Sequence, residues 1–313
     1  MFKPVRLIPD DTKIPFMRAS RFGFFISGIL CAASILLFAF LGLNYGVDFK
    51  GGTNFIVRFQ QDANLDELRR KMNSLGLGEV EIQGFGEPTD VSIRVEAHEG
   101  DEAQQAVTDK VKEALGPDVE YLSIESLGPK VSGELTEQGT IAVVTAIIAI
   151  VIYIWFRFEW QFAIGAVVSL LHDVLLTIGL FAVLRLDFNL TIIAAILTIV
   201  GYSLNDTVVV FDRIREYMRK FKQMPLADLI DTSINSVLPR TLLTSMTALL
   251  ALLALYIWGG EVLRGFTFCM IWGVLIGTYS SIFIASPILI LLGTNRDTLG
   301  GARAKAVAEK ARP

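Results

Sequence analysis

Six long apolar stretches dominate the pattern of hydrophobic and polar positions along the chain. Each is close to the roughly 20 residues that a helix needs to cross a bilayer core about 30 Å thick. They predict transmembrane helices over residues 22–43, 138–156, 162–184, 189–211, 240–258 and 266–292. The first stretch is too long for the apolar part of a signal peptide and lacks a convincing cleavage site, so we interpret it as a retained anchor.

One long hydrophilic segment, 44–137, separates the first two apolar stretches. Alternation with period 2 predicts strands over 53–60, 79–85, 91–97 and 119–127, and helical patterns cover 65–75 and 101–115. Gly76 and Gly116 follow the two helices as expected for C-terminal caps, and GEPTD (86–90) is interpreted as a turn. The order β-α-β-β-α-β predicts a small ferredoxin-like α+β domain. The expected fold is therefore an α-helical polytopic membrane protein with this domain between its first two transmembrane helices.

Composition agrees with a membrane protein and excludes several functions. The chain is 52% hydrophobic and 19% charged, with a net charge of −4, which gives no general attraction to nucleic acid. Cys31 and Cys269 lie in apolar stretches and are interpreted as packing residues, and His98 and His172 are the only histidines, so neither a metal site nor another cofactor is expected. The phosphate-cradling motif G-x-x-x-x-G-K-[ST] is absent. We therefore expect a non-enzymatic protein whose energy source is external.

Lysine and arginine flank the apolar stretches on one side of the predicted membrane. With six spans, the amino-terminal arm 1–21, the connection between the fourth and fifth spans, and the tail 293–313 share that side, which the positive-inside rule makes cytoplasmic. The basic residues are Lys3, Arg6, Lys13, Arg18 and Arg21, then Arg213, Arg215, Arg219, Lys220 and Lys222, and finally Arg296, Arg303, Lys305, Lys310 and Arg312. Both termini are thus predicted to be cytoplasmic, and 44–137 to face the periplasm of a bacterial inner membrane.

Polar residues inside the apolar stretches are candidates for function, because a charge at bilayer depth costs at least about 2.5–3.5 kcal/mol. Asp206 is placed roughly 9 Å inside the cytoplasmic end of the fourth span, and Arg240 begins the fifth. An arginine side chain that snorkels can reach such a carboxylate, so a pair that protonation of Asp206 would switch is feasible. Asp173, roughly one turn deeper, would extend a staged proton path; His172, Asn205 and Asp212 are further relay candidates.

Simpler interpretations remain open for most of these positions. Arg213 and Arg240 can be interfacial anchors, Asp212 can be a helix-end residue, and His172 can hydrogen-bond a neighbouring helix. The glycines Gly46, Gly51 and Gly52 of GVDFKGG can form a hinge, a tight turn into a strand, or both, and the linker 128–137 is a second candidate hinge. Gly273 and Gly277 form a small-xxx-small face typical of close helix packing.

Four motifs together resemble the SecD/SecF family of protein-export membrane proteins, within the resistance-nodulation-division superfamily. They are GVDFKGGT (46–53), SLLHD (169–173), GYSLNDTVVVFDRIRE (201–216) and RTLLTSMTALL (240–250). The resemblance covers residues from about 15 to 293. GVDFKGG is common to SecD and SecF, whereas the six-span length and NDTVVVFDR favour the SecF branch.

The resemblance implies an auxiliary subunit of the Sec protein translocase. With SecD as partner, such a subunit uses the proton gradient to draw polypeptides out of the SecYEG channel after SecA has pushed them in; YajC and YidC are further expected partners. The family's intramembrane aspartate and arginine correspond to Asp206 and Arg240, and a complete proton path is expected to need SecD. The alternatives are an efflux-pump component of the same superfamily and a non-transporting translocon scaffold.

Overall fold

A computed structural model describes residues 9, 12–78, 80–98 and 100–294. The chain divides into two compact units. The first, here called the helical unit, holds the residues up to Gly42, Thr145–Arg185 and those from Ala194 onward; the second, the sheet unit, holds Leu43–Val144 and Leu186–Ile193. The basic residues Lys3 and Arg6 of the predicted arm, and Arg296, Arg303, Lys305, Lys310 and Arg312 of the predicted tail, lie outside the described residues.

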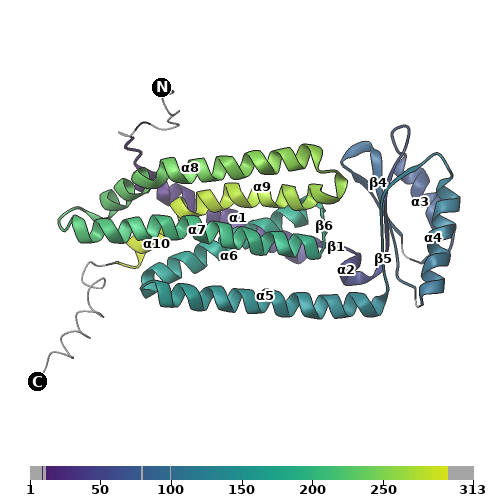
Figure 1. Cartoon of the computed structure of the whole chain (residues 1–313), viewed down its shortest axis with the longest axis horizontal. Helices are drawn as coiled ribbons and strands as arrows, with labels where there is room; N and C mark the ends of the chain where they lie inside the picture. The colour runs from purple at the N-terminus through teal and green to yellow at the C-terminus, as the bar shows by residue number, and fades with distance from the viewer. Residues whose placement is uncertain (1–8, 10–11, 79, 99, 295–313) are drawn as a thin grey trace, which may run out of the picture. The chain divides into compact units, whose positions relative to one another are not determined.

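Long helices account for most of the described chain (Figure 1). They are α1 (Phe16–Leu41), α5 (Pro129–Arg157), α6 (Trp160–Leu184), α7 (Leu190–Lys220), α8 (Leu226–Trp258) and α9 (Glu261–Ser280), which continues through a π-helical turn, η1 (Ser281–Ala285), into α10 (Ser286–Leu291). Within the described residues, six helical stretches are long and apolar enough to cross a membrane, the last being Leu263–Leu291. The predicted polytopic helical fold is therefore confirmed.

Several helices extend beyond the apolar stretches that predict them. Helix α7 runs on to Lys220 and α8 begins at Leu226, so much of the basic connection predicted between the fourth and fifth spans is helical. Helix α5 begins at Pro129, so the linker 128–137 is mostly helical, and its predicted role as a hinge stays a prediction. Hydropathy marks only the part of a helix that suits lipid, whereas backbone hydrogen bonds continue the helix into polar sequence. Proline is tolerated in the first turn because its missing N–H has no helical partner there.

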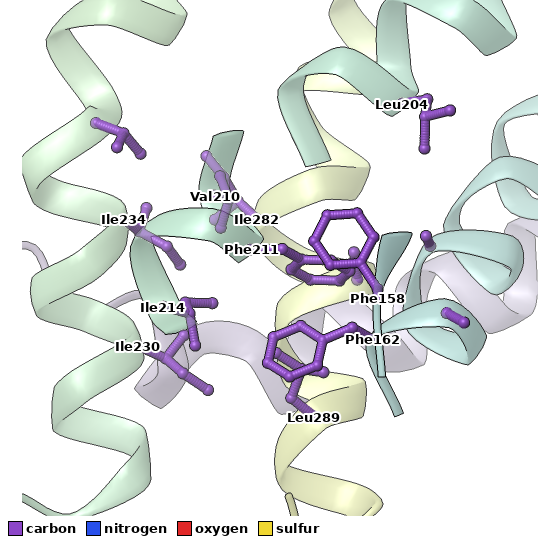
Figure 2. Close-up of a cluster of buried hydrophobic side chains, with 14 of the residues drawn as sticks. Phe158, Phe162, Leu204, Val210, Phe211, Ile214, Ile230, Ile234, Ile282 and Leu289 are labelled. Atoms are coloured by element: carbon purple, nitrogen blue, oxygen red, sulfur yellow. The ribbon is translucent and has the colours of Figure 1, made fainter. Parts of the chain in front are cut away.

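Aromatic and aliphatic side chains form the core of the helical unit (Figure 2). The ring of Phe211 on α7 meets Phe158 and Phe162 edge-on, with ring centroids 5.8 and 5.1 Å apart. Aliphatic side chains from α7, α8, η1 and α10 pack around these rings, among them Ile214, Ile230, Ile234, Ile282 and Leu289. Because lipid is as apolar as these side chains, such van der Waals packing, rather than exclusion of water, holds helices together where they cross the bilayer.

Helix α9 approaches α7 closely through its two spaced glycines. A Cβ atom added to Gly277 would lie 2.9 Å from Cβ of Ser203, and one added to Gly273 would overlap the side chain of Ile199. This is the close packing that the small-xxx-small spacing predicts. The same face of α7 carries Asp206, one of the candidate residues.

The sheet unit contains a four-stranded antiparallel sheet. Its strands are β2 (Gly52–Arg58), β3 (Val80–Phe85), β4 (Glu87–Val95) and β5 (Glu120–Leu127), in the spatial order β3-β4-β2-β5. Helices α3 (Leu65–Asn73) and α4 (Asp101–Leu115) cover one face (Figure 1). Side chains from both layers form the core: Phe55, Val57, Leu68, Met72, Leu77, Ile82, Val91, Ile93, Val95, Val107 and Val111. This is the predicted ferredoxin-like arrangement.

The turn predicted over GEPTD is wrong in its position. Strand β4 already begins at Glu87, and Phe85 pairs with Glu87 around Gly86, whose φ is +75°. The carbonyl groups of Pro88 and Thr89 accept hydrogen bonds from the backbone, so these turn-like residues extend the strand. The composition of GEPTD is typical of a turn, but backbone hydrogen bonds to residues elsewhere in the sheet unit decide its conformation. The local sequence does not reveal those bonds.

Three short elements of the sheet unit were not predicted. Strand β1 (Asn44–Tyr45) pairs in parallel with β6 (Asp187–Phe188), and the helical turn α2 (Val47–Lys50) follows β1. Strands of two residues carry no periodicity, and these two are far apart along the chain. Through β6, the connection between α6 and α7 becomes part of the sheet unit.

Candidate functional site

Asp206 lies on α7 and is buried among helices of the helical unit. Its side chain is 2% exposed, and its Oδ2 atom has no hydrogen-bond partner among the described residues. The carboxylate interacts with the hydroxyl of Thr278 on α9, which is in turn 2.8 Å from Oγ of Ser245 on α8. Three helices therefore meet at a carboxylate that retains an unused acceptor, an arrangement suited to taking up a proton.

Arg240 does not form the predicted ion pair with Asp206 in this structure. Its side chain on α8 is exposed, and no salt bridge joins it to Asp206 or to another residue of the described chain. Its positive charge nevertheless acts on the Asp206 carboxylate. The two groups are thus electrostatically coupled but separate.

Asp173 is the centre of a second buried polar cluster. This α6 residue is fully buried and accepts hydrogen bonds from Oγ of Ser203 at 2.5 Å and Oγ of Ser280 at 2.8 Å. Nδ1 of His172 lies 2.9 Å from its other oxygen, while Nε2 has no partner in the described part of the chain. The His172 ring stacks on Tyr279, with ring centroids 6.1 Å apart. Unlike the carboxylate of Asp206, the carboxylate of Asp173 has partners for both of its oxygens.

The two carboxylates share their supporting helices. Ser203 stands one helical turn before Asp206 on α7, and Thr278 and Ser280 are close neighbours on α9. Hydroxyl groups both donate and accept hydrogen bonds, so they can pass a proton between acidic groups. These three hydroxyl residues are not predicted from the sequence, because serine and threonine are common in transmembrane helices. The only signal is the spacing of Ser203, one helical turn before Asp206. A relay through Asp173 and His172 stays a prediction.

The remaining relay candidates are not brought into this cluster. Asn205 is exposed, although it adjoins Asp206 in sequence. Asp212 forms an ion pair with Arg157 at 2.6 Å and lies 3.6 Å from Arg215, at a partly exposed position. These contacts favour a structural role for Asp212, but the helix end predicted there is wrong, because α7 continues to Lys220.

The glycines of GVDFKGG occupy constrained positions in the sheet unit. Gly51 and Gly52 have φ values of +75° and +107°, and a Cβ on Gly52 would collide with the carbonyl oxygen of Val95. Gly46 donates its N–H to the carbonyl of Phe188 at 2.8 Å. The predicted hinge at Gly46, Gly51 and Gly52 stays a prediction, which these contacts argue against.

Within the described residues, no group of three or more side chains that could ligate a metal ion is found.

Comparison with known families identifies the class of this protein. The family model described as "Protein export membrane protein SecD/SecF, C-terminal" matches residues 106–295, and the "SecD/SecF GG Motif" model matches residues 36–63. The chain belongs to the SecD/SecF family. The family predicted from the four sequence motifs is therefore confirmed.

Individual members of the SecD/SecF family match nearly the whole chain. The protein translocase subunit SecF of Rhodobacter capsulatus is 46% identical over 309 residues, covering 94% of this chain and 93% of that protein. The SecDF subunit of Brucella abortus is 42% identical over 300 residues, covering 95% of this chain and 40% of that longer protein. The solved SecDF of Thermus thermophilus matches with a TM-score of 0.83 and 33% identity, covering 92% of this chain and 40% of that one. These relatives confirm the predicted class, an auxiliary subunit of the Sec protein translocase.

Proposed function

We propose that this SecD/SecF family member works with SecD and uses the proton-motive force to promote late stages of polypeptide export through SecYEG. The observation that carries the proposal is Asp206, a buried carboxylate with an unpartnered oxygen in a helix long enough to cross the membrane. A scaffold gains nothing from such a group, because an ionisable residue in lipid is costly. The proposal includes no nucleotide hydrolysis by this chain.

The energetics of Asp206 suit a proton-driven switch. The membrane potential supplies about 2.3 kcal/mol per charge per 100 mV, close to the roughly 2.5–3.5 kcal/mol that a buried aspartate costs on insertion scales. Protonation removes the charge of Asp206, whereas Arg240 stays charged at any relevant pH. The chain then alternates between a state with Asp206 and Arg240 paired and a state with them apart. The second state corresponds to the geometry described above.

SecD is the partner that the relatives support most directly. The SecDF proteins of Brucella and Thermus carry the matched region as part of a longer chain, as expected if SecD and SecF act as one assembly. SecYEG, the translocating preprotein, YajC and YidC are the further proposed partners. The remainder of the proton path is expected to lie in SecD.

We place the sheet unit in the periplasm of a bacterial inner membrane and both termini in the cytoplasm, following the distribution of basic residues. An Asp62→Cys variant is then expected to react with a membrane-impermeant thiol reagent in spheroplasts. Lys222→Cys, in the connection between α7 and α8, is expected to react only after permeabilisation. Both side chains are exposed, and the native chain, with Cys31 partly buried and Cys269 buried, is the control for labelling of the native cysteines. The opposite labelling pattern would contradict this orientation.

The proposed function is tested by following preprotein export into inverted membrane vesicles. Vesicles contain SecYEG and SecD, with or without this chain, and export is compared with and without a proton gradient after ATP is exhausted. We expect the gradient to advance stalled preprotein only when this chain and SecD are both present. Equal export in all vesicles would leave the chain as a scaffold.

A further inference from the structure

The GVDFKGG motif contacts the beginnings of two long helices within the sheet unit. The Asp48 carboxylate accepts a hydrogen bond from the backbone N–H of Leu190, the first residue of α7, at 2.8 Å. The carbonyl of Val47 accepts one from the hydroxyl of Ser132, near the start of α5, at 3.0 Å. The motif therefore holds both helix starts rather than leading freely from α1 into β2.

Asp48 acts as an external cap for α7. The first N–H groups of a helix lack partners within it, and the positive end of the helix dipole favours a carboxylate. Asn189 supplies an ordinary cap by accepting a hydrogen bond from the N–H of Ile192 at 3.0 Å, and Asp48 satisfies Leu190. A side chain from the motif thereby fixes the position and direction of the first turn of α7.

A buried arginine holds the connection between α6 and α7 in the same place. Arg94 is 6% exposed, on the face of β4 opposite the helices, and donates to Asp187, Asn44 and Glu81, each at 2.9 Å. Asn44 also donates to Asp187 at 2.6 Å, beside the pairing of β1 with β6. The connection is thus held by backbone pairing, a salt bridge and side-chain hydrogen bonds.

The surroundings of this cluster are acidic, which explains why it needs Arg94. The pKa of Glu125 on β5 is raised by loss of hydration and then by the negative charges of Asp48 and Asp187, with Arg94 acting in the opposite direction. Removing the arginine would leave several carboxylates close together. The positive charge therefore binds the connection and offsets this repulsion.

We propose that Asp48 is a positioning residue, and that GVDFKGG, Arg94 and Asp187 form a rigid junction that holds the first turn of α7 within the sheet unit. This inference rests on the proposed function. Leu190 and Asp206 both belong to helix α7. If α7 shifts when Asp206 gains or loses a proton, its first turn is expected to keep these contacts, so the junction itself does not act as a hinge.

A disulfide tests whether the junction stays closed. Tyr45 and Phe188 are paired neighbours in β1 and β6, a spacing that a disulfide can bridge. The Tyr45→Cys/Phe188→Cys double variant is assayed for gradient-driven export in its oxidised and reduced forms, each single variant serving as a control for the native cysteines. We expect oxidation to leave gradient-driven export unchanged. Loss on oxidation with recovery on reduction would show that the junction opens during the cycle and would overturn the proposal.

Substitution of Asp48 tests its positioning role. Asp48→Ala removes the cap, whereas Asp48→Asn keeps an oxygen that accepts the Leu190 N–H bond, since asparagine caps helices as well as aspartate does. We expect Asp48→Ala to lose most of the gradient-driven increment and Asp48→Asn to recover most of it. Asp62→Ala, at an exposed position of the same unit, is the matched control. Assembly with SecD is checked by co-purification.

The native chain separates failure of this inference from failure of the proposed function. If the native chain shows no gradient-driven increment, the proposed function is wrong. If the native chain shows it and Asp48→Ala shows it equally, the positioning role is wrong while the function stands. If Asp48→Ala assembles poorly with SecD, the positioning role is tested instead by Asp48→Asn and by the disulfide variant. Both of these keep the cap.

Discussion

Replacing Asp206 by asparagine is expected to reduce export in the presence of a proton gradient to the level seen without one. Asparagine has nearly the same shape as aspartate, so the packing of α7 against α8 and α9 is retained. It cannot take up or release a proton, and the switch loses its only change of charge at this position. The measurement is the vesicle export assay, with and without a gradient, in the presence of SecD.

The neighbouring residue provides a matched control for this substitution. Asn205 is exposed and adjoins Asp206, so Asn205→Ala should behave as the native chain. Asp206→Glu keeps a titratable group and should retain part of the stimulation. Full stimulation in Asp206→Asn would place the coupling residue elsewhere, most simply in SecD.

The Asp173 cluster adds a second arm to the same experiment. If Asp173 only binds α7 and α9 through Ser203 and Ser280, Asp173→Asn should weaken assembly with SecD and gradient-driven export together. If it relays protons, the variant should assemble normally but lose the stimulation. This comparison separates the two roles that the geometry allows for a well-satisfied buried carboxylate.

Gly52→Ala is expected to destabilise the sheet unit severely. The φ of +107° at Gly52 is costly for any residue with a Cβ, by about 1–2 kcal/mol in the left-handed region. The new methyl group would also collide with the backbone oxygen of Val95 on β4, and overpacking costs typically about 1–3 kcal/mol more. Together these costs are a large fraction of the roughly 5–15 kcal/mol by which domains are stable. Thermal unfolding and limited proteolysis of the full chain in detergent measure the loss.

Gly76→Ala is the control that isolates the steric term. Gly76 also has a positive φ, +64°, but nothing lies within 4 Å of the position that a Cβ would take. This variant should lose only the backbone contribution, about 1–2 kcal/mol. If both variants lost the same stability, the close approach of β2 to β4 at Gly52 would have no energetic importance.

Much of the fold was predictable because it depends on local properties of the sequence. Length and hydropathy identify six helices that can span a membrane, and alternation identifies the four strands of the sheet unit, because burial of one face imposes period 2. The helix Asp101–Leu115 was predicted with its exact bounds, since Gly100 and Gly116 delimit its polar and apolar periodicity. Errors arose where hydrogen bonding continues past the composition signal, as in α5, α7 and the segment GEPTD.

Only the charged residues of the candidate site could be predicted from the sequence. An aspartate in an apolar helix is conspicuous, so the sequence singles out Asp206 and Asp173. Whether a side chain faces another helix or the outside depends on helix rotation, and a helix that is apolar all round does not encode rotation in its periodicity. Tertiary structure alone therefore places Asn205 outside the cluster, Ser203 and Ser280 beside Asp173, and Arg240 apart from Asp206.

The sequence by itself determined the membrane class, the ferredoxin-like domain, the family and the identity of the titratable residues. Only the tertiary structure decided which groups meet. The pairing of Asn44–Tyr45 with Asp187–Phe188 joins segments more than a hundred residues apart, and Asp48 caps α7 across a similar separation along the chain. Contacts of this kind depend on packing between distant segments, whereas periodicity and composition report only on a residue's immediate neighbours along the chain.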